Sequence, residues 1–113
     1  MTYSTLDQVK RYLNMSLDDT REDSLLQALQ ESAYNDINMI LSEFTDVPIT
    51  DENEVKILGD IEAMWAAGLY RMRVEQRPDI PQQQWSHPLI EIARKRLLTY
   101  IEKRFLGIYF EVV

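Results

Sequence analysis

Apolar residues recur every three or four positions along most of the chain, the spacing of one face of an α-helix. The first such segment covers about residues 4–14, and Thr5 with Gln8 fits a capping box at its start. The second begins at Asp19 or Thr20 and carries the longest apolar stripe: Leu26, Leu29, Ala33, Ile37, Ile40 and Phe44. Both segments are therefore predicted to be helices that bury one face.

Two further helices are predicted in the second half. The third is capped by Thr50, and its residues 63–70 are apolar nearly all round. That pattern is typical of a central helix covered on several sides. The fourth begins at Pro88, a residue suited to the first helical turn, with Ser86 or His87 as its cap.

Two segments lack a helical pattern. Residues 77–88 hold three of the four prolines, and Trp85 among them is a candidate anchor for a partner. Beyond Gly107, which is predicted to end the fourth helix, residues 108–113 (IYFEVV) are mostly β-branched or aromatic and are predicted to form a strand. A lone strand in a helical domain either covers the core or pairs with another molecule. The sequence thus predicts one all-α domain, residues 1–113: a small four-helix bundle with a short C-terminal extended strand.

Composition narrows the function classes. The 113 residues are 45% hydrophobic and 27% charged, enough apolar material for one core. The absence of cysteine excludes a disulfide scaffold, a thiolate zinc site and a thiol nucleophile. No apolar run approaches the roughly 20 residues needed to span a bilayer, and the first residues lack the apolar core of a signal peptide. We therefore expect an intracellular or intra-particle protein that does not bind a membrane.

Charge is distributed unevenly. The net charge is −7, which argues against a general electrostatic footprint for nucleic acid. Residues 1–62 hold 14 acidic and 4 basic side chains, a net of −10, whereas residues 63–113 hold 5 acidic and 8 basic, a net of +3. Copies of such a chain could meet head to tail. Solvated helix faces of unequal sign explain the same numbers.

Catalytic and metal-binding patterns are not apparent in the sequence. His87 is the single histidine, and no second histidine stands at zinc-ligand spacing. Acidic clusters around residues 18–23 and 51–54 fit helix starts without a cation, and the three glycines are too scattered to cradle a phosphate. We therefore expect no enzyme activity, no cofactor and no metal. The contrary hypothesis, which we keep as an alternative, is a helical enzyme subunit with a carboxylate metal site.

The basic residues of the fourth helix are the strongest electrostatic feature. Arg94, Lys95 and Arg96 point in three directions on a helix, and Lys103 and Arg104 follow near its end. Three interpretations are open: a solvated face, a docking face for an acidic neighbour, or contact with nucleic acid. The candidate interface residues are Trp85, Arg94, Lys95, Lys103, Arg104, Ile108, Tyr109, Phe110, Glu111, Val112 and Val113.

Residues 6–41 also resemble a known family. Residues 6–13 read L-D-Q-V-K-R-Y-L, residues 16–23 form an acidic linker, and residues 25–33 read L-L-Q-A-L-Q-E-S-A. This order is similar to that of the head–tail connector proteins, also called adaptor or head-completion proteins, of tailed phages and related viruses. Beyond residue 41 only the order of elements agrees, and residues 78–88 match nothing in the family.

The resemblance implies a structural role in the virion neck, after synthesis in the host cytoplasm. Such proteins form a homo-oligomeric ring, usually of twelve copies, beneath the portal protein. The ring extends the DNA channel and docks a tail-completion or other neck protein. DNA would pass through the lumen without specific binding, which suits an acidic surface because like charges repel. The alternative is a small acidic regulator or DNA mimic that binds a DNA-handling protein, which the net of −10 over residues 1–62 favours.

Overall fold

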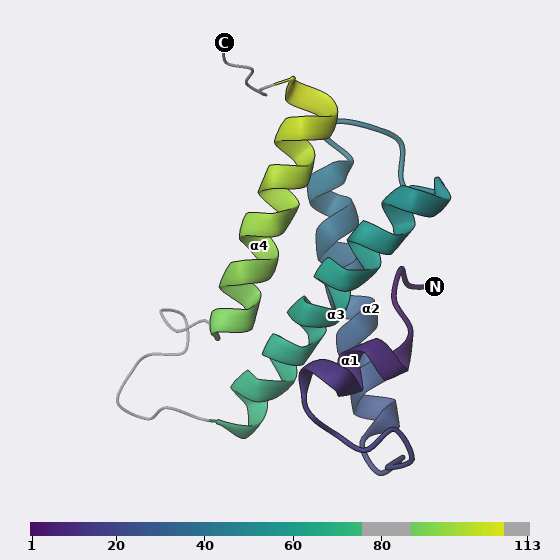
Figure 1. Cartoon of the computed structure of the whole chain (residues 1–113), viewed down its shortest axis with the longest axis vertical. Helices are drawn as coiled ribbons and strands as arrows, with labels where there is room; N and C mark the ends of the chain where they lie inside the picture. Colours follow the sequence, from purple (N-terminus) through teal and green to yellow (C-terminus); the bar gives the residue numbers. More distant parts are fainter. Residues whose placement is uncertain (76–86, 108–113) are drawn as a thin grey trace.

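The computed structural model describes residues 1–75 and 87–107 (Figure 1). Its elements are α1 (Leu6–Tyr12), α2 (Asp23–Leu41), α3 (Glu52–Val74), α4 (Pro88–Ile101) and a π-helical turn, η2 (Glu102–Leu106). The four predicted helices and the all-α class are confirmed. The predicted strand at 108–113 and the segment that holds Trp85 lie outside the described residues. In the described ranges, no helix is both long enough and apolar enough to cross a membrane.

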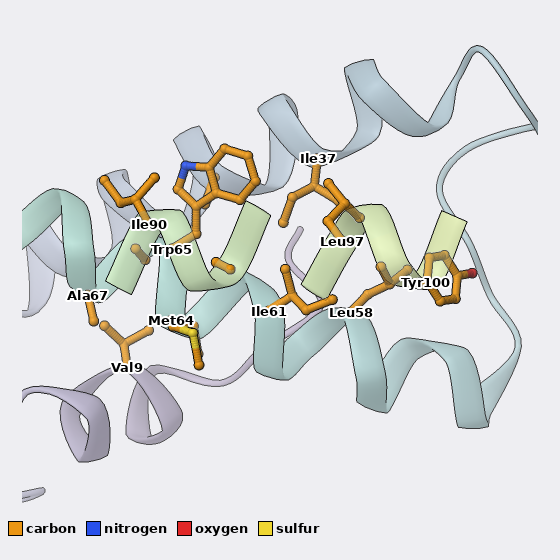
Figure 2. Close-up of a cluster of buried hydrophobic side chains, with 14 of the residues drawn as sticks. Val9, Ile37, Leu58, Ile61, Met64, Trp65, Ala67, Ile90, Leu97 and Tyr100 are labelled. Carbon is orange, nitrogen blue, oxygen red and sulfur yellow. The ribbon is translucent and has the colours of Figure 1, made fainter. Parts of the chain in front are cut away.

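The long helix α3 is the centre of the bundle. It packs against α1, α2 and α4, and every residue from Ile61 to Gly68 is buried. Figure 2 shows the core around it, with Val9 of α1 directed toward Met64 and Ala67 of α3. The other helices contribute Leu26, Ile37 and Leu97 among their buried residues. The predicted central position of residues 63–70 is therefore confirmed, because partners cover this helix on three sides.

Most predicted helix ends are confirmed. Thr5 and Gln8 form the capping box of α1, and the imidazole Nδ1 of His87 accepts a hydrogen bond from the Leu89 N–H at 3.1 Å. Gly107 adopts a left-handed φ of 60° after η2, as a helix-stopping glycine does. Two ends differ. Asp51, not Thr50, caps α3, since its carboxylate accepts from the Glu54 N–H at 3.1 Å. Helix α2 ends at Leu41, three residues before Phe44.

The predicted start of α2 at Asp19 or Thr20 is wrong, because these residues join two successive turns, 16–19 and 20–23. The Asp19 N–H donates to the Ser16 carbonyl at 3.1 Å, and the Asp23 N–H donates to the Thr20 carbonyl at 3.3 Å. The Arg21 guanidinium donates to both Asp19 carboxylate oxygens, at 3.0 and 2.9 Å, and lowers the pKa of Asp19 to about 2. Helix α2 therefore begins only at Asp23.

A buried lysine holds this turn segment against α1. The Nζ of Lys10 donates to the carbonyls of Leu17 and Asp19, at 3.3 and 2.8 Å, and lies 2.8 Å from the Asp23 carboxylate. The Lys10 side chain is almost fully buried. One ammonium group thus fixes the linker and the first turn of α2.

A buried glutamate holds the N-terminal residues. Glu62 of α3 is fully buried, and its carboxylate accepts the N–H groups of Tyr3 and Ser4, at 3.0 and 2.9 Å, and the Ser4 hydroxyl. Gln30 of α2 donates to the Ser4 carbonyl at 3.0 Å. Desolvation raises the pKa of Glu62, whereas the hydrogen bonds from Ser4 and Tyr3 oppose that shift. The residues that precede α1 are therefore attached to α2 and α3.

Gly68 allows α4 to approach α3 closely. A Cβ atom at this position would lie 2.5 Å from Cγ1 and 3.0 Å from the backbone nitrogen of Ile90. A side chain at this position would therefore push α4 away from α3, which explains a glycine in the interior of a helix despite its low helix propensity.

Replacing Gly68 with alanine should destabilise the protein by about 1 kcal/mol. The crowding against Ile90 destabilises the folded state by about 1–3 kcal/mol, and the better helix propensity of alanine stabilises it by about 1 kcal/mol. Urea unfolding measures the difference. Combining the change with Ile90→Ala should cost less than the sum of the two single changes, since the clashing atom is gone. Strict additivity would contradict this explanation.

Candidate interaction surface

A groove of about 860 Å³ lies between α3 and α4, which run side by side in Figure 1. Helix α2 lies behind these two helices in that view and contributes no residue to the groove. Its lining residues are Glu54, Lys56, Ile57, Asp60, Ile61, Ile92, Lys95, Arg96, Thr99, Tyr100, Lys103 and Arg104.

The groove combines an apolar surface with a basic rim. Ile57 and Ile92 are 49% and 45% exposed, although both are large apolar residues. Five basic and two acidic residues line the groove, a net of +3, in a chain whose net charge is −7. An apolar floor with charged edges is the usual composition of a protein-binding site.

Two ion pairs join α3 and α4 along the groove. Arg96 of α4 donates to Asp60 of α3 at 2.7 Å, and Tyr12 of α1 donates to the other oxygen of that carboxylate at 2.6 Å. Burial, followed by the hydrogen bond to Asp60, raises the pKa of Tyr12. Because Asp60 contacts both α1 and α4, it connects the groove to the rest of the bundle.

The second pair lies nearer the end of α4. Glu54 of α3 accepts hydrogen bonds from the Tyr100 hydroxyl and from the Arg104 Nε, the latter at 2.8 Å. Burial and then the Glu54 hydrogen bond raise the pKa of Tyr100 far above its usual range, so the hydroxyl remains a donor. The Arg104 guanidinium also lies 4.9 Å from the centre of the Phe105 ring. This arginine is held in place from two sides.

The structure brings some of the predicted interface residues together. Lys95, Lys103 and Arg104 line the groove, whereas Arg94 does not. The Arg94 guanidinium lies 5.5 Å from the centre of the Trp65 ring and 3.9 Å from the Glu91 carboxylate. Trp85 and the six residues Ile108, Tyr109, Phe110, Glu111, Val112 and Val113 lie outside the described residues.

Sequence reasoning missed the apolar part of this surface. Neither Ile57 nor Ile92 was among the candidate interface residues, which were basic residues of the fourth helix or residues of the two segments without a helical pattern. Both are isoleucines that a helical wheel turns away from the buried face, and that mismatch was the available signal. Arg96 was noted in the basic run but was not assigned to the interface.

No protein-family profile, curated protein or solved structure matches this chain. Within residues 1–75 and 87–107, no cluster of three or more histidine, aspartate or glutamate side chains is arranged to hold a metal ion. The groove is therefore interpreted from its own geometry and charge.

Proposed function

We propose that this chain is a virion structural protein of the phage neck, an adaptor that forms a ring beneath the portal and docks the tail or the next neck protein. The observation that carries the proposal is the basic, apolar-floored groove between α3 and α4 on an acidic chain. An adaptor acts by presenting such surfaces to its neighbours. The resemblance over residues 6–41 and the small helical fold support the same role.

Polar contacts between the elements, some buried and some exposed, suit a protein that works as a rigid spacer. Glu62 holds the segment that precedes α1, and Lys10 holds the segment that precedes α2. The pairs Asp60–Arg96 and Glu54–Arg104 join α4 to α3. A groove held by its own ion pairs changes little when a partner binds, so less conformational entropy is lost on binding.

Co-purification from cells tests the proposal. The protein, tagged at its exposed N-terminus, is expressed with its neighbouring genes, and co-purifying proteins are identified by mass spectrometry. We expect a portal or a tail-completion protein. A bait with Lys95→Glu and Lys103→Glu should recover less of it. A bait with Arg11→Glu and Arg73→Glu is the matched control, since both arginines are exposed outside the groove and the charge change is equal.

A second function has one observation in its favour. Residues 22–55 contain nine acidic side chains and no lysine or arginine, as expected of a small acidic regulator or DNA mimic. Recovery of a nuclease, polymerase or repressor without any structural protein would overturn the neck proposal. Competition with DNA for that partner's binding site would then establish the mimic.

A further inference from the structure

An acidic ridge runs along the exposed side of α2 and into the turn that follows it. We define it by Asp36, Met39, Ile40 and Glu43, all of which are exposed. Met39 is 70% exposed, unusual for a large apolar side chain. The adjacent side of the same helix is buried through Leu26, Ala33 and Ile37, which pack into the core. Ile40, which the sequence placed in the buried stripe of this helix, is instead 38% exposed at the edge of the buried side. Within residues 1–75 and 87–107 the ridge is therefore an exposed surface that combines acidic and apolar residues.

The ridge and the groove have matching compositions. The groove offers two exposed isoleucines and a net charge of +3, whereas the ridge offers Met39 and Ile40 beside two carboxylates. The ridge belongs to a 34-residue stretch, residues 22–55, that holds every acidic residue of α2 and no base. Charge complementarity of this kind orients partners and speeds their association.

We infer that the groove between α3 and α4 receives the acidic ridge of a second copy of this chain. The inference names the partner of the groove and rests on the proposed adaptor function. Because the ridge and the groove share no residue, the contact is head to tail. A pair of copies joined in this way keeps one free ridge and one free groove for further copies, and such contacts close into a ring when the rotation between copies allows it.

Disulfide trapping tests the contact on a clean background, since the chain has no cysteine. One partner carries Met39→Cys, and the other carries Ile57→Cys and a longer N-terminal tag, so that the mixed dimer is resolved on a gel. Oxidised glutathione serves as the oxidant. The matched control replaces Ile57→Cys with Val74→Cys, because Val74 is 54% exposed on the same helix but lies outside the groove.

We expect the ridge–groove pair to cross-link at least about tenfold faster than the control pair at low salt, and the excess to shrink near 1 M salt, where charges are screened beyond about 3 Å. Lys95→Glu with Lys103→Glu in the groove partner should remove the excess. Asp36→Lys with Glu43→Lys in the ridge partner should do the same, and combining both sets should restore it. Equal rates for the two cysteine pairs overturn the inference.

The outcomes separate this inference from the proposed function. Equal cross-linking rates together with recovery of a portal protein would reject the ridge–groove contact and leave the adaptor role standing. Fast, charge-dependent cross-linking without any structural protein in the pull-down would keep the contact and reject the neck assignment. A groove that binds the portal instead of a second copy gives the first of these results.

Discussion

Replacing Lys10 with alanine should lower the free energy of unfolding by about 3 kcal/mol, since it leaves a carboxylate and two carbonyls without their shared donor. The Lys10 ammonium is buried, and the Asp23 carboxylate beside it is less than one-third exposed. Removing one partner of such a group leaves polar atoms that water reaches poorly. The loss should appear as a lower urea midpoint with an unchanged slope.

The neighbouring Arg11 provides the control. It lies on the same short helix but is exposed, so Arg11→Ala should change stability by less than about 0.5 kcal/mol. Hydrogen exchange should also accelerate at the amides of residues 17–23 in the Lys10 variant. Equal stabilities of the two variants would mean that the linker is held by other contacts.

Replacing Glu62 with glutamine should cost about 2 kcal/mol at neutral pH, because the side-chain NH₂ group cannot accept the hydrogen bonds that the carboxylate accepts. Glutamine nearly matches glutamate in volume, so the core packing around α3 is preserved. Glu43→Gln is the matched control, since Glu43 is exposed. A loss no greater than that of the control would contradict the assigned role of Glu62.

The pH dependence of this loss has a defined sign. Desolvation raises the pKa of Glu62 above its usual 4.5, so the folded state binds more protons than the unfolded state just above that pH. The wild-type free energy of unfolding should therefore decline as the pH rises from about 4.5 through the raised pKa, and glutamine has no such titration. The difference in free energy of unfolding between wild type and the Glu62→Gln variant should be largest near pH 4 and smaller at pH 7. A gap that widens with pH would show that ionised Glu62 is favoured by folding.

The sequence predicted the helices well because their signals are local. The capping box at Thr5, the proline and histidine before α4, and the left-handed Gly107 depend on neighbours within a few residues. The prediction of where α2 starts was wrong because the contacts that decide it are not local. The Asp19 carbonyl accepts a hydrogen bond from the Nζ of Lys10, a residue on another helix, and the Asp23 N–H donates to Thr20 instead of to Asp19. Such a contact leaves no periodic trace in the sequence.

The candidate site was predictable only in part. Basic residues near the end of the fourth helix were visible in the sequence, and three of the four predicted there share the groove. The ion pair of Arg96 with Asp60 joins residues 36 positions apart, and that of Arg104 with Glu54 joins residues 50 positions apart. Pairing over that distance follows from how α3 and α4 pack, which no short motif encodes.

The attachment of the N-terminal residues affects the order of events during synthesis. Tyr3 and Ser4 are synthesised before all of their partners, which are Gln30, Asn38, Ile49 and Glu62. Contacts so distant in sequence form only after the intervening chain has been made, and they slow folding. Tyr3 and Ser4 therefore reach their native contacts only after the middle of α3 has been synthesised, long after they themselves were made.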